Sequence, residues 1–499
     1  MTLPHDIWVH VSQFLPALLL RDLLSVNHSF FEIAMDCRYR QLIFAYLDDR
    51  MLKNMARLRD PAVAKRVRIL HIEPSFLNLT DSAPLYFTPS KQQETTLPKH
   101  RSLRSMLTDI ANLLLEQKNF SRHPKYRIMQ ALKKREDVVQ VLSEVLSGLP
   151  NVKDYYVSWT GLPLASPTLS TFLTSPFQLK LRKLSLNVSL DNVPSLMTPE
   201  SSLPQLEELH LCIHSETVAD KLQAANILRR YLAPVISRLR STLKTFVISA
   251  WEATDLSPLF ANLAQFPLLD DLSINIPVEP CHLGHPSGTN GFLAKHQSSL
   301  RCLRLRPTLY GGKGLAANLF SFHDWILAAT AGISFTKLRV LDMTSSLFPT
   351  DTSLMCLQRF SRTLTSLSLT GVYRTYEDVF DMLEMATKNS SCGLTHLRIG
   401  PVGLCPELID LMASKLPSLQ RLEISARDIY PSLPDADITK FSKTAQIESF
   451  FTAMESRSYT SWKLQSLSIV ADVLPENDPF EAALEQTFFQ CVPSLRFFT

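Results

Sequence analysis

A six-residue pattern, apolar-x-x-apolar-x-apolar, recurs along this 499-residue chain. Such a repeat limits the possible folds strongly, because one short unit cannot bury its apolar side alone and must stack on its neighbours. Clear copies, 25 to 45 residues apart, begin at Leu181, Leu206, Leu243, Leu269, Leu300, Leu338, Leu364, Leu394, Leu419 and Leu464. Weaker copies begin at Val67 and Val152, and a truncated copy begins at Leu495. The pattern predicts a repeat array rather than one compact core.

Each copy ends in an alternation of apolar and polar residues, as in Leu184-Ser185-Leu186, which is typical of a half-buried strand. Between the copies, apolar residues follow helical spacing at 224–239, 316–329, 376–388, 405–415 and 445–456. Parallel strands joined by helices stack into a curved coil, with the strands about 4.8 Å apart. We therefore predict an α/β solenoid with a parallel sheet on the concave side and helices on the convex side.

This arrangement resembles the leucine-rich-repeat superfamily, in its longer, helix-bearing form, over residues 150–499. The family carries Asn or Cys three positions after the last Leu of the pattern. Those positions hold other residues here, among them Ser189, His214, Val372, Val402 and Arg427. Because the family's side chain satisfies backbone groups of the loop, its absence predicts irregular loops and uneven curvature.

The first 47 residues follow a different pattern, in which Leu3-Pro4 and Asp6 precede apolar residues at helical spacing. They resemble the F-box, whose order is Leu-Pro, an acidic residue, Ile, spaced apolar residues, then Asp-Leu-Leu, Val and an aromatic. The matching residues are Leu3, Pro4, Asp6, Ile7, Val11, Leu15, Asp22, Leu23, Leu24, Val26 and Phe30. Two positions depart from the family. This chain has Asn27 where the family often has Cys, and Phe30 where the family most commonly has Trp. The resemblance implies an all-α module of short helices.

An F-box followed by leucine-rich repeats is the arrangement of substrate receptors in Skp-cullin-F-box ubiquitin ligases. The resemblance implies that the F-box binds a Skp adaptor, and through it a cullin scaffold, while the solenoid holds an unknown target protein. The implied adaptor contacts are Leu3, Pro4, Ile7, Val11, Leu15, Leu23, Leu24, Val26 and Phe30. A second interpretation stays open: the helices only cap the apolar edge of the solenoid, and the protein is an interaction scaffold outside any ligase.

We expect three segments, namely an F-box-like module at 1–47, a connecting segment at 48–150 and the irregular solenoid at 151–499. Within the connecting segment, 51–66 is interpreted as a linker to the strand at Val67. Residues 73–100 are rich in Pro, Ser and Thr and are interpreted as a mobile loop. Two longer helices are predicted at 103–116 and 126–149.

Charge and composition argue against several classes of partner. The 51 basic and 47 acidic residues leave a net charge of +4, far from the dense basic patch that binds nucleic acid. The early apolar run at 14–20 is too short for a signal peptide or a membrane span. The 8 cysteines are scattered singly, which favours a reducing compartment, so we expect the protein in the cytoplasm or nucleus.

Three motifs invite a chemical interpretation, and none has the spacing that its chemistry needs. Cys281-His282-Leu283-Gly284-His285 lacks a second Cys/His cluster for zinc. Gly311-Gly312-Lys313-Gly314 lacks the spacing of a phosphate-binding P-loop, and His323-Asp324 has no nucleophile in a fixed relation to it. We therefore expect a binding protein rather than an enzyme, with no catalytic residues, metal or cofactor.

Polar residues that alternate with the leucines should face the concave side, where repeat proteins bind their partners. The candidates for target binding are Arg304, Arg306, His396, Arg398 and Arg421, with Ser366, Ser368 and Thr370 between them. This surface is expected to be mildly cationic and rich in hydroxyls. Because guanidinium groups bind oxyanions through paired hydrogen bonds, one hypothesis is an acidic or phosphorylated target segment. The alternative is an ordinary solvated sheet face.

Overall fold

The computed structural model describes two compact units, Met1–Leu206 and Glu207–Thr499, and each is treated by itself. The described residues are 4–46, 49–73, 135–160, 164, 167–198, 203–215, 218, 220–250, 254–277, 283–308, 315–344, 348–388, 393–433, 443–471 and 479–499. Within these ranges no helix has both the length and the apolar character needed to cross a membrane.

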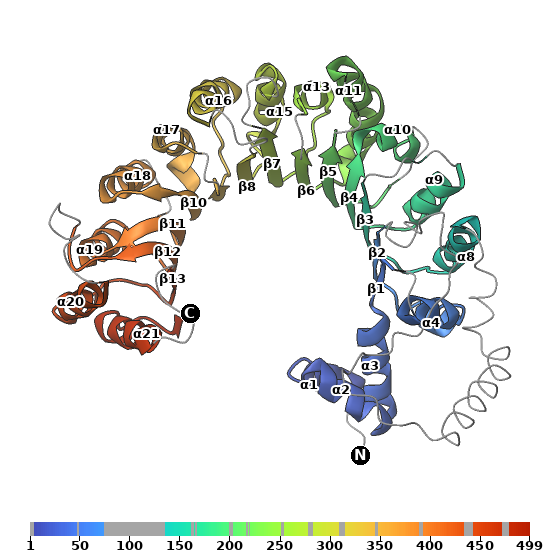
Figure 1. Ribbon diagram of the computed structural model, residues 1–499, viewed down its shortest axis with the longest axis horizontal. Helices are drawn as coiled ribbons and strands as arrows, with labels where there is room; N and C mark the ends of the chain where they lie inside the picture. The colour runs from blue at the N-terminus through green and yellow to red at the C-terminus, as the bar shows by residue number, and fades with distance from the viewer. Residues whose placement is uncertain are drawn as a thin grey trace, which may run out of the picture. The chain divides into compact units, whose positions relative to one another are not determined.

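The first unit begins with short helices and continues as a parallel sheet in chain order (Figure 1). Its helical elements are α1 (His5–Ser12), α2 (Ala17–Asp22), η1 (Leu23–Ser25), α3 (His28–Tyr39), α4 (Asp49–Arg57), α5 (Pro61–Ala64), α8 (Arg135–Ser147), α9 (Pro167–Thr174), η3 (Ser175–Gln178), η4 (Leu190–Asn192) and α10 (Val193–Leu196). Its strands are β1 (Gln41–Phe44), β2 (Ile69–Ile72), β3 (Asp154–Trp159) and β4 (Lys183–Ser189).

The second unit repeats strand and helix throughout, with every described strand pair parallel. Its strands are β5 (Glu208–His214), β6 (Thr245–Ala250), β7 (Asp271–Pro277), β8 (Cys302–Thr308), β9 (Val340–Asp342), β10 (Ser366–Arg374), β11 (His396–Leu404), β12 (Arg421–Ile429), β13 (Ser466–Ala471) and β14 (Phe497–Phe498). In Figure 1 these strands line the inner side of the unit's bend, and its helices lie outside them.

The helices of the second unit connect its successive strands. They are α11 (Lys221–Ile227), η5 (Leu228–Leu232), α12 (Ala233–Arg238), η6 (Leu239–Ser241), α13 (Ser257–Asn262), α15 (Ser287–His296), α16 (Leu315–Ala329), α17 (Thr350–Phe360), η7 (Ser361–Thr363), α18 (Tyr376–Lys388), α19 (Pro406–Lys415), α20 (Lys443–Glu455) and α21 (Pro479–Cys491). The five helices predicted between copies of the repeat are all present, with ends shifted by a few residues at most.

The middle residue of each sequence repeat aligns with that of the next in the strand register. In the second unit this buried column runs through Leu209, Phe246, Leu272, Leu303, Leu341, Leu367, Leu397, Leu422 and Leu467. The first unit has the equivalent column Leu42, Leu70, Tyr155 and Leu184. Burial of this column against the helices stabilises each unit by roughly 25 cal/mol for every Å² of apolar surface removed from water. The predicted α/β leucine-rich-repeat-like architecture is therefore confirmed.

Two segments before the first predicted strand differ from expectation. Residues 41–44, predicted to lie in the helical module, form β1 and pair with β2. The signal was present, since Tyr39, Leu42 and Phe44 follow the repeat pattern and all three are buried. The predicted linker at 51–66 contains α4 and α5 instead, and the apolar side of α4 is buried in the first unit through Met51, Leu52 and Met55.

The other expectations for the connecting segment fall mostly outside the described residues. This applies to almost all of the loop predicted at 73–100, to the helix predicted at 103–116 and to the first part of the helix predicted at 126–149. The described remainder of the last helix is α8. The boundaries of the three predicted segments stay predictions.

Side chains from scattered positions satisfy loop backbone groups in place of the missing Asn ladder. Asn192 Oδ1 accepts from the Leu164 N–H at 2.9 Å, and Arg374 donates to the Phe348 carbonyl at 2.9 Å. Trp462 Nε1 donates to the Leu416 carbonyl at 3.0 Å. Each bond joins one repeat to a neighbour, and each uses different chemistry, as expected for irregular loops.

His296, at the end of α15, makes one such connection from a fully buried position. Its Nε2 accepts from the Phe266 N–H at 2.9 Å, while its Nδ1 lies 2.7 Å from the Phe292 carbonyl. Nδ1 must therefore carry the proton, and the ring is neutral. Burial between Phe266 and Phe292 lowers the pKa of His296 below its usual 6.5.

We predict that His296→Leu lowers the free energy of unfolding by about 1–3 kcal/mol at pH 7.5, because the buried Phe266 N–H loses its acceptor. The folded pKa lies below the unfolded one, so the unfolded chain binds more protons once the pH falls below about 6.5. The wild-type protein should lose stability there, and the variant should lack this part of the pH dependence.

Urea titrations at pH 7.5 and 5.5 measure both effects, with His396→Gln at an exposed histidine as the control. A His296→Leu variant that keeps the wild-type stability and pH dependence would contradict the assignment.

Candidate functional site

The N-terminal helices α1, α2, η1 and α3 enclose a small core of their own. Leu20, Phe30 and Ile33 are buried at its centre, and Trp8 packs on Phe30 with ring centroids 4.8 Å apart. Asn27 begins α3 by accepting from the Phe30 N–H at 2.9 Å through its side chain. This departure from the F-box pattern is thus a helix cap, the role for which Asn is among the best residues.

Outside this core the same helices leave several large apolar side chains exposed to solvent. The most exposed are Phe14 at 76% and Val26 at 60%. The full set, named here the N-terminal apolar surface, comprises Ile7, Val9, Val11, Phe14, Leu19, Val26 and Phe31. Ile7 and Val11 lie one turn apart on α1, so they occupy one face of that helix.

The residues predicted to contact an adaptor divide between this surface and the core. Pro4, Ile7, Val11 and Val26 are exposed. The remaining five predicted contacts differ: Leu15 and Leu23 are half-buried against the core, Phe30 lies within it, Leu3 is outside the described residues, and the Leu24 side chain is not described.

The prediction for Phe30 as a surface contact is wrong, because its ring fills the core beside Trp8. The other members of the surface, Val9, Phe14, Leu19 and Phe31, were not predicted, although each is an apolar residue within a turn of a matched position or of a buried one. Their exposure depends on how the helices pack, which the motif alone does not specify.

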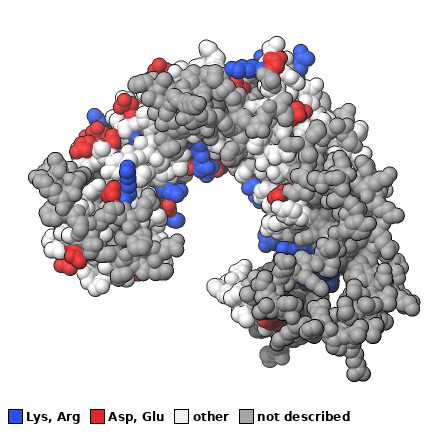
Figure 2. All heavy atoms as spheres, in the orientation of Figure 1, with Lys and Arg blue, Asp and Glu red and all other residues white. Residues whose placement is uncertain are grey.

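The second unit presents a row of polar side chains on the side of its sheet opposite the buried leucines. Ser273, Arg304, Asp342, Ser368, Arg398, Glu423 and Ser468 are aligned in the register from β7 to β13. We name this row and its neighbours on the same strands the polar strand face. Figure 2 shows basic side chains next to acidic ones on the inner side of this unit.

The predicted target-binding arginines all lie on the polar strand face, and each pairs with a carboxylate. Arg304 contacts Asp271, and Arg306 lies 3.1 Å from an oxygen of Asp342. Both partners come from neighbouring strands and were missed, because their proximity depends on the strand register.

A second group lies on β11 and β12. Glu423 forms ion pairs with Arg421 on its own strand, at 3.0 Å, and with Arg398 on β11, at 3.4 Å. His396 on β11 instead contacts the Thr395 hydroxyl at 2.9 Å. The surface therefore carries partly exposed ion pairs, in which Asp271, Asp342 and Glu423 offset most of the positive charge of the arginines.

The chemical motifs identified in the sequence contribute little to either surface. Cys281, His282 and the Gly311-Gly312-Lys313-Gly314 run lie outside the described residues. His323 Nδ1 lies 2.8 Å from the Thr352 hydroxyl, which links α16 to α17. Over the described ranges, no group of three or more His, Cys, Asp or Glu residues is arranged to hold a metal ion.

Comparisons with known proteins give little information on family. No protein-family model matches the chain, and no curated protein matches it. Among solved structures, the chain is similar to a crystal structure of the Rad7 and Elc1 complex in yeast, at 14% sequence identity. The match covers 68% of this chain and 97% of that chain, with a TM-score of 0.29.

We predict that two neighbouring residues of β8 respond very differently to substitution. Leu303→Ala should lower the free energy of unfolding by about 2–5 kcal/mol, because it leaves a cavity in the buried column. Arg304→Met should cost less than about 1 kcal/mol, because its ion pair with Asp271 is partly exposed to solvent. Urea denaturation followed by circular dichroism measures both, and equal losses would contradict the assigned faces of the sheet.

Proposed function

We propose that this protein is the substrate-recognition subunit of a Skp-cullin-F-box ubiquitin ligase, in which it binds and does not catalyse. The N-terminal apolar surface would bind the Skp adaptor, which connects to the cullin, and the polar strand face would hold the target. One observation carries the proposal. Ile7, Val11 and Val26, at positions that the F-box resemblance assigns to the adaptor, are exposed on a module that has its own core.

The exposure of these side chains has a physical cost that argues for a partner. Apolar surface in water is unfavourable, and large exposed apolar side chains on a short module favour a partner that covers them. Val26 is 60% exposed although the same short module buries Leu20 and Ile33. Burying Ile7, Val11 and Val26 under an adaptor would stabilise the complex without repacking the module.

The polar strand face fits a protein target better than a small molecule. It offers exposed Arg–carboxylate pairs, spread over β7 to β12, instead of a single concave apolar pocket. Such mixed charge steers association and selects a partner with a complementary pattern, but each pair adds little affinity. The target would therefore present both basic and acidic side chains.

The alternative is a scaffold whose N-terminal helices only cap the repeat array, and one feature favours it. Helix α3 packs on β1 and α5, and Tyr39 at its end is buried, so this helix does cover the edge of the first repeat. However, a cap needs a polar outer face to stay soluble. The exposed Phe14, Leu19 and Val26 do not meet that requirement.

We predict that the double variant Ile7→Asp and Val26→Asp binds a recombinant Skp adaptor at least tenfold more weakly than the wild-type chain, because charge replaces the apolar contact. Isothermal titration with the full chain measures the affinity. Leu222→Asp on α11, at a residue that is 70% exposed, is the matched control and should bind like the wild type.

Circular dichroism should show that all three chains are folded, since the substituted side chains are exposed. Adaptor binding that is unchanged in the double variant, or absent in the folded wild type, would contradict the proposal and favour the scaffold.

A further inference from the structure

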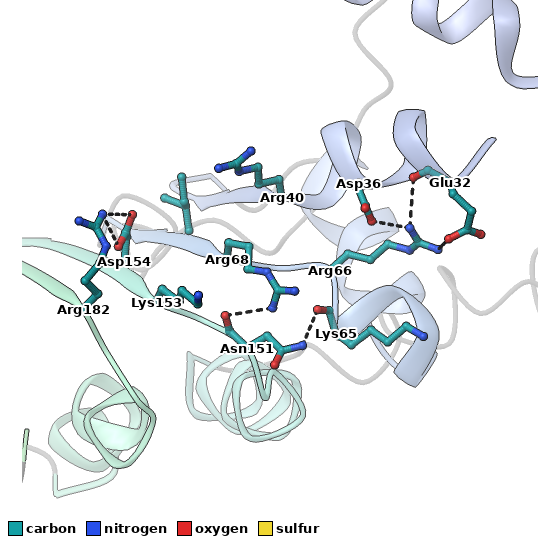
Figure 3. A pocket seen from close by; sticks show the side chains of 11 residues that line it. Glu32, Asp36, Arg40, Lys65, Arg66, Arg68, Asn151, Lys153, Asp154 and Arg182 are labelled. Atoms are coloured by element: carbon teal, nitrogen blue, oxygen red, sulfur yellow. Dashed lines mark hydrogen bonds and ion pairs between the residues drawn. The ribbon is translucent and has the colours of Figure 1, made fainter. Parts of the chain in front are cut away.

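A pocket of about 610 Å³ in the first unit is lined mainly by charged side chains (Figure 3). It lies where α3 and the chain before β2 meet the beginnings of β2, β3 and β4. Its cationic residues are Arg40, Lys65, Arg66, Arg68, Lys153 and Arg182. Its carboxylates are Glu32, Asp36 and Asp154, which leaves a surplus of positive charge. We name it the basic pocket.

Four of these cations occupy the same position in four consecutive repeats. Arg40, Arg68, Lys153 and Arg182 each stand directly before a strand, β1 to β4 in turn. Backbone bonds align them, because the N–H of Arg68, Lys153 and Arg182 donates to the carbonyl of Arg40, Arg68 and Lys153 respectively, at 2.7–2.9 Å. Neighbouring strands are about 4.8 Å apart, so four positive side chains are stacked in a column.

Two pocket cations are already neutralised and form its walls. Arg66 has a side chain only 10% exposed and donates to Glu32 Oε2 at 2.6 Å and to Asp36. Its hydrogen bond holds the pKa of Glu32 below the usual value. On the other side, Arg182 donates to both oxygens of Asp154 at 3.1 Å.

Between these walls the remaining cations form no ion pair with a carboxylate of the described residues. Arg40 and Lys153 are exposed, and neither forms an ion pair with any described acidic residue (Figure 3). The Arg68 side chain donates to the Asn151 carbonyl at 3.4 Å, and the Asn151 side chain donates to the Lys65 carbonyl at 2.7 Å. Asn151 therefore holds the segment 65–68 in place through two backbone carbonyls, and neither bond neutralises the charge of Lys65 or Arg68.

The repeat itself does not require a cation at this position. In the second unit the residues directly before the strands β5 to β14 are, in order, Glu207, Lys244, Asp270, Arg301, Arg339, Thr365, Thr395, Gln420, Gln465 and Arg496. There Lys244 pairs with Glu207 at 2.8 Å. Like charges on adjacent strands destabilise a sheet, so Arg40, Arg68 and Lys153 side by side have a cost that an anionic ligand would offset.

We propose that the basic pocket is a binding site for a phosphate-bearing ligand. A phosphoryl group carries up to two negative charges near neutral pH, which suits the positive surplus of the pocket. Arg40 and Arg68 can donate to its oxygens in pairs, and Lys153 adds a compact charge. The phosphoryl group could belong to a captured protein or to a free polyphosphate. The inference stands apart from the ligase role, because it uses neither the N-terminal apolar surface nor the polar strand face.

The test measures binding to the full chain by isothermal titration at 150 mM salt. The probes are inorganic pyrophosphate and an acidic peptide with one phosphoserine, and the same peptide without the phosphate is the reference. The pocket variant is Arg40→Gln with Lys153→Gln, both at exposed positions. The matched control is Arg301→Gln with Arg339→Gln, which removes the same charge from exposed positions of the same kind in the second unit.

We expect the pocket variant to lose at least tenfold in affinity for the probe that the wild type binds, and the control to lose less than twofold. The probe should also raise the melting temperature of the wild type and of the control, but not that of the pocket variant. If the phosphopeptide binds more tightly than both its unphosphorylated form and pyrophosphate, the phosphoryl group comes from a protein. If pyrophosphate binds more tightly than the phosphopeptide, the ligand is a small anion.

Two results would overturn the proposal. One is the absence of binding to either probe at millimolar concentration. The other is an equal loss in the pocket variant and the control, which would indicate only diffuse attraction to a basic surface. The pocket variant should keep its affinity for the Skp adaptor, so failure here is distinguishable from failure of the ligase proposal.

Discussion

Burial of one apolar column against the helices is the constraint on which the rest of the structure depends. In the second unit Leu303 and its aligned neighbours, such as Leu341 and Leu367, point toward the helices because each strand alone cannot shield them from water. Successive side chains of a strand point to opposite faces, so the residues between the leucines must face solvent. The same packing therefore builds the core and displays Arg304 and Arg398 on the other face.

Strand register then determines which charged side chains lie next to each other on neighbouring strands. Parallel neighbours bring Arg304 close to Asp271 and Arg306 close to Asp342, although each pair is more than thirty residues apart in sequence. In the first unit the register instead stacks Arg40, Arg68 and Lys153 with too few acids between them. The same strand register thus produces neutralised ion pairs in the second unit and a basic pocket in the first.

In the short N-terminal module some apolar side chains are buried in a core and others are exposed to solvent. Phe30 and Leu20 form its core, while Ile7 and Val26 remain exposed. A motif records only that these positions are apolar, and it does not say which of them the helices cover. For this reason Ile7 and Val26 are exposed and Phe30 is buried, although the motif treats all three alike, and adaptor binding by the exposed two stays a prediction.

By itself, the sequence determined the repeat, its strands and most of its helices, because apolar periodicity reports directly which side of a short element is buried. It also contained the pattern of β1 at Tyr39, Leu42 and Phe44, although the residues before β1 follow helical spacing. Only the tertiary structure decided the partners of the arginines and the assembly of the basic pocket. Those depend on register between strands that intervening loops of variable length separate, and no local pattern encodes it.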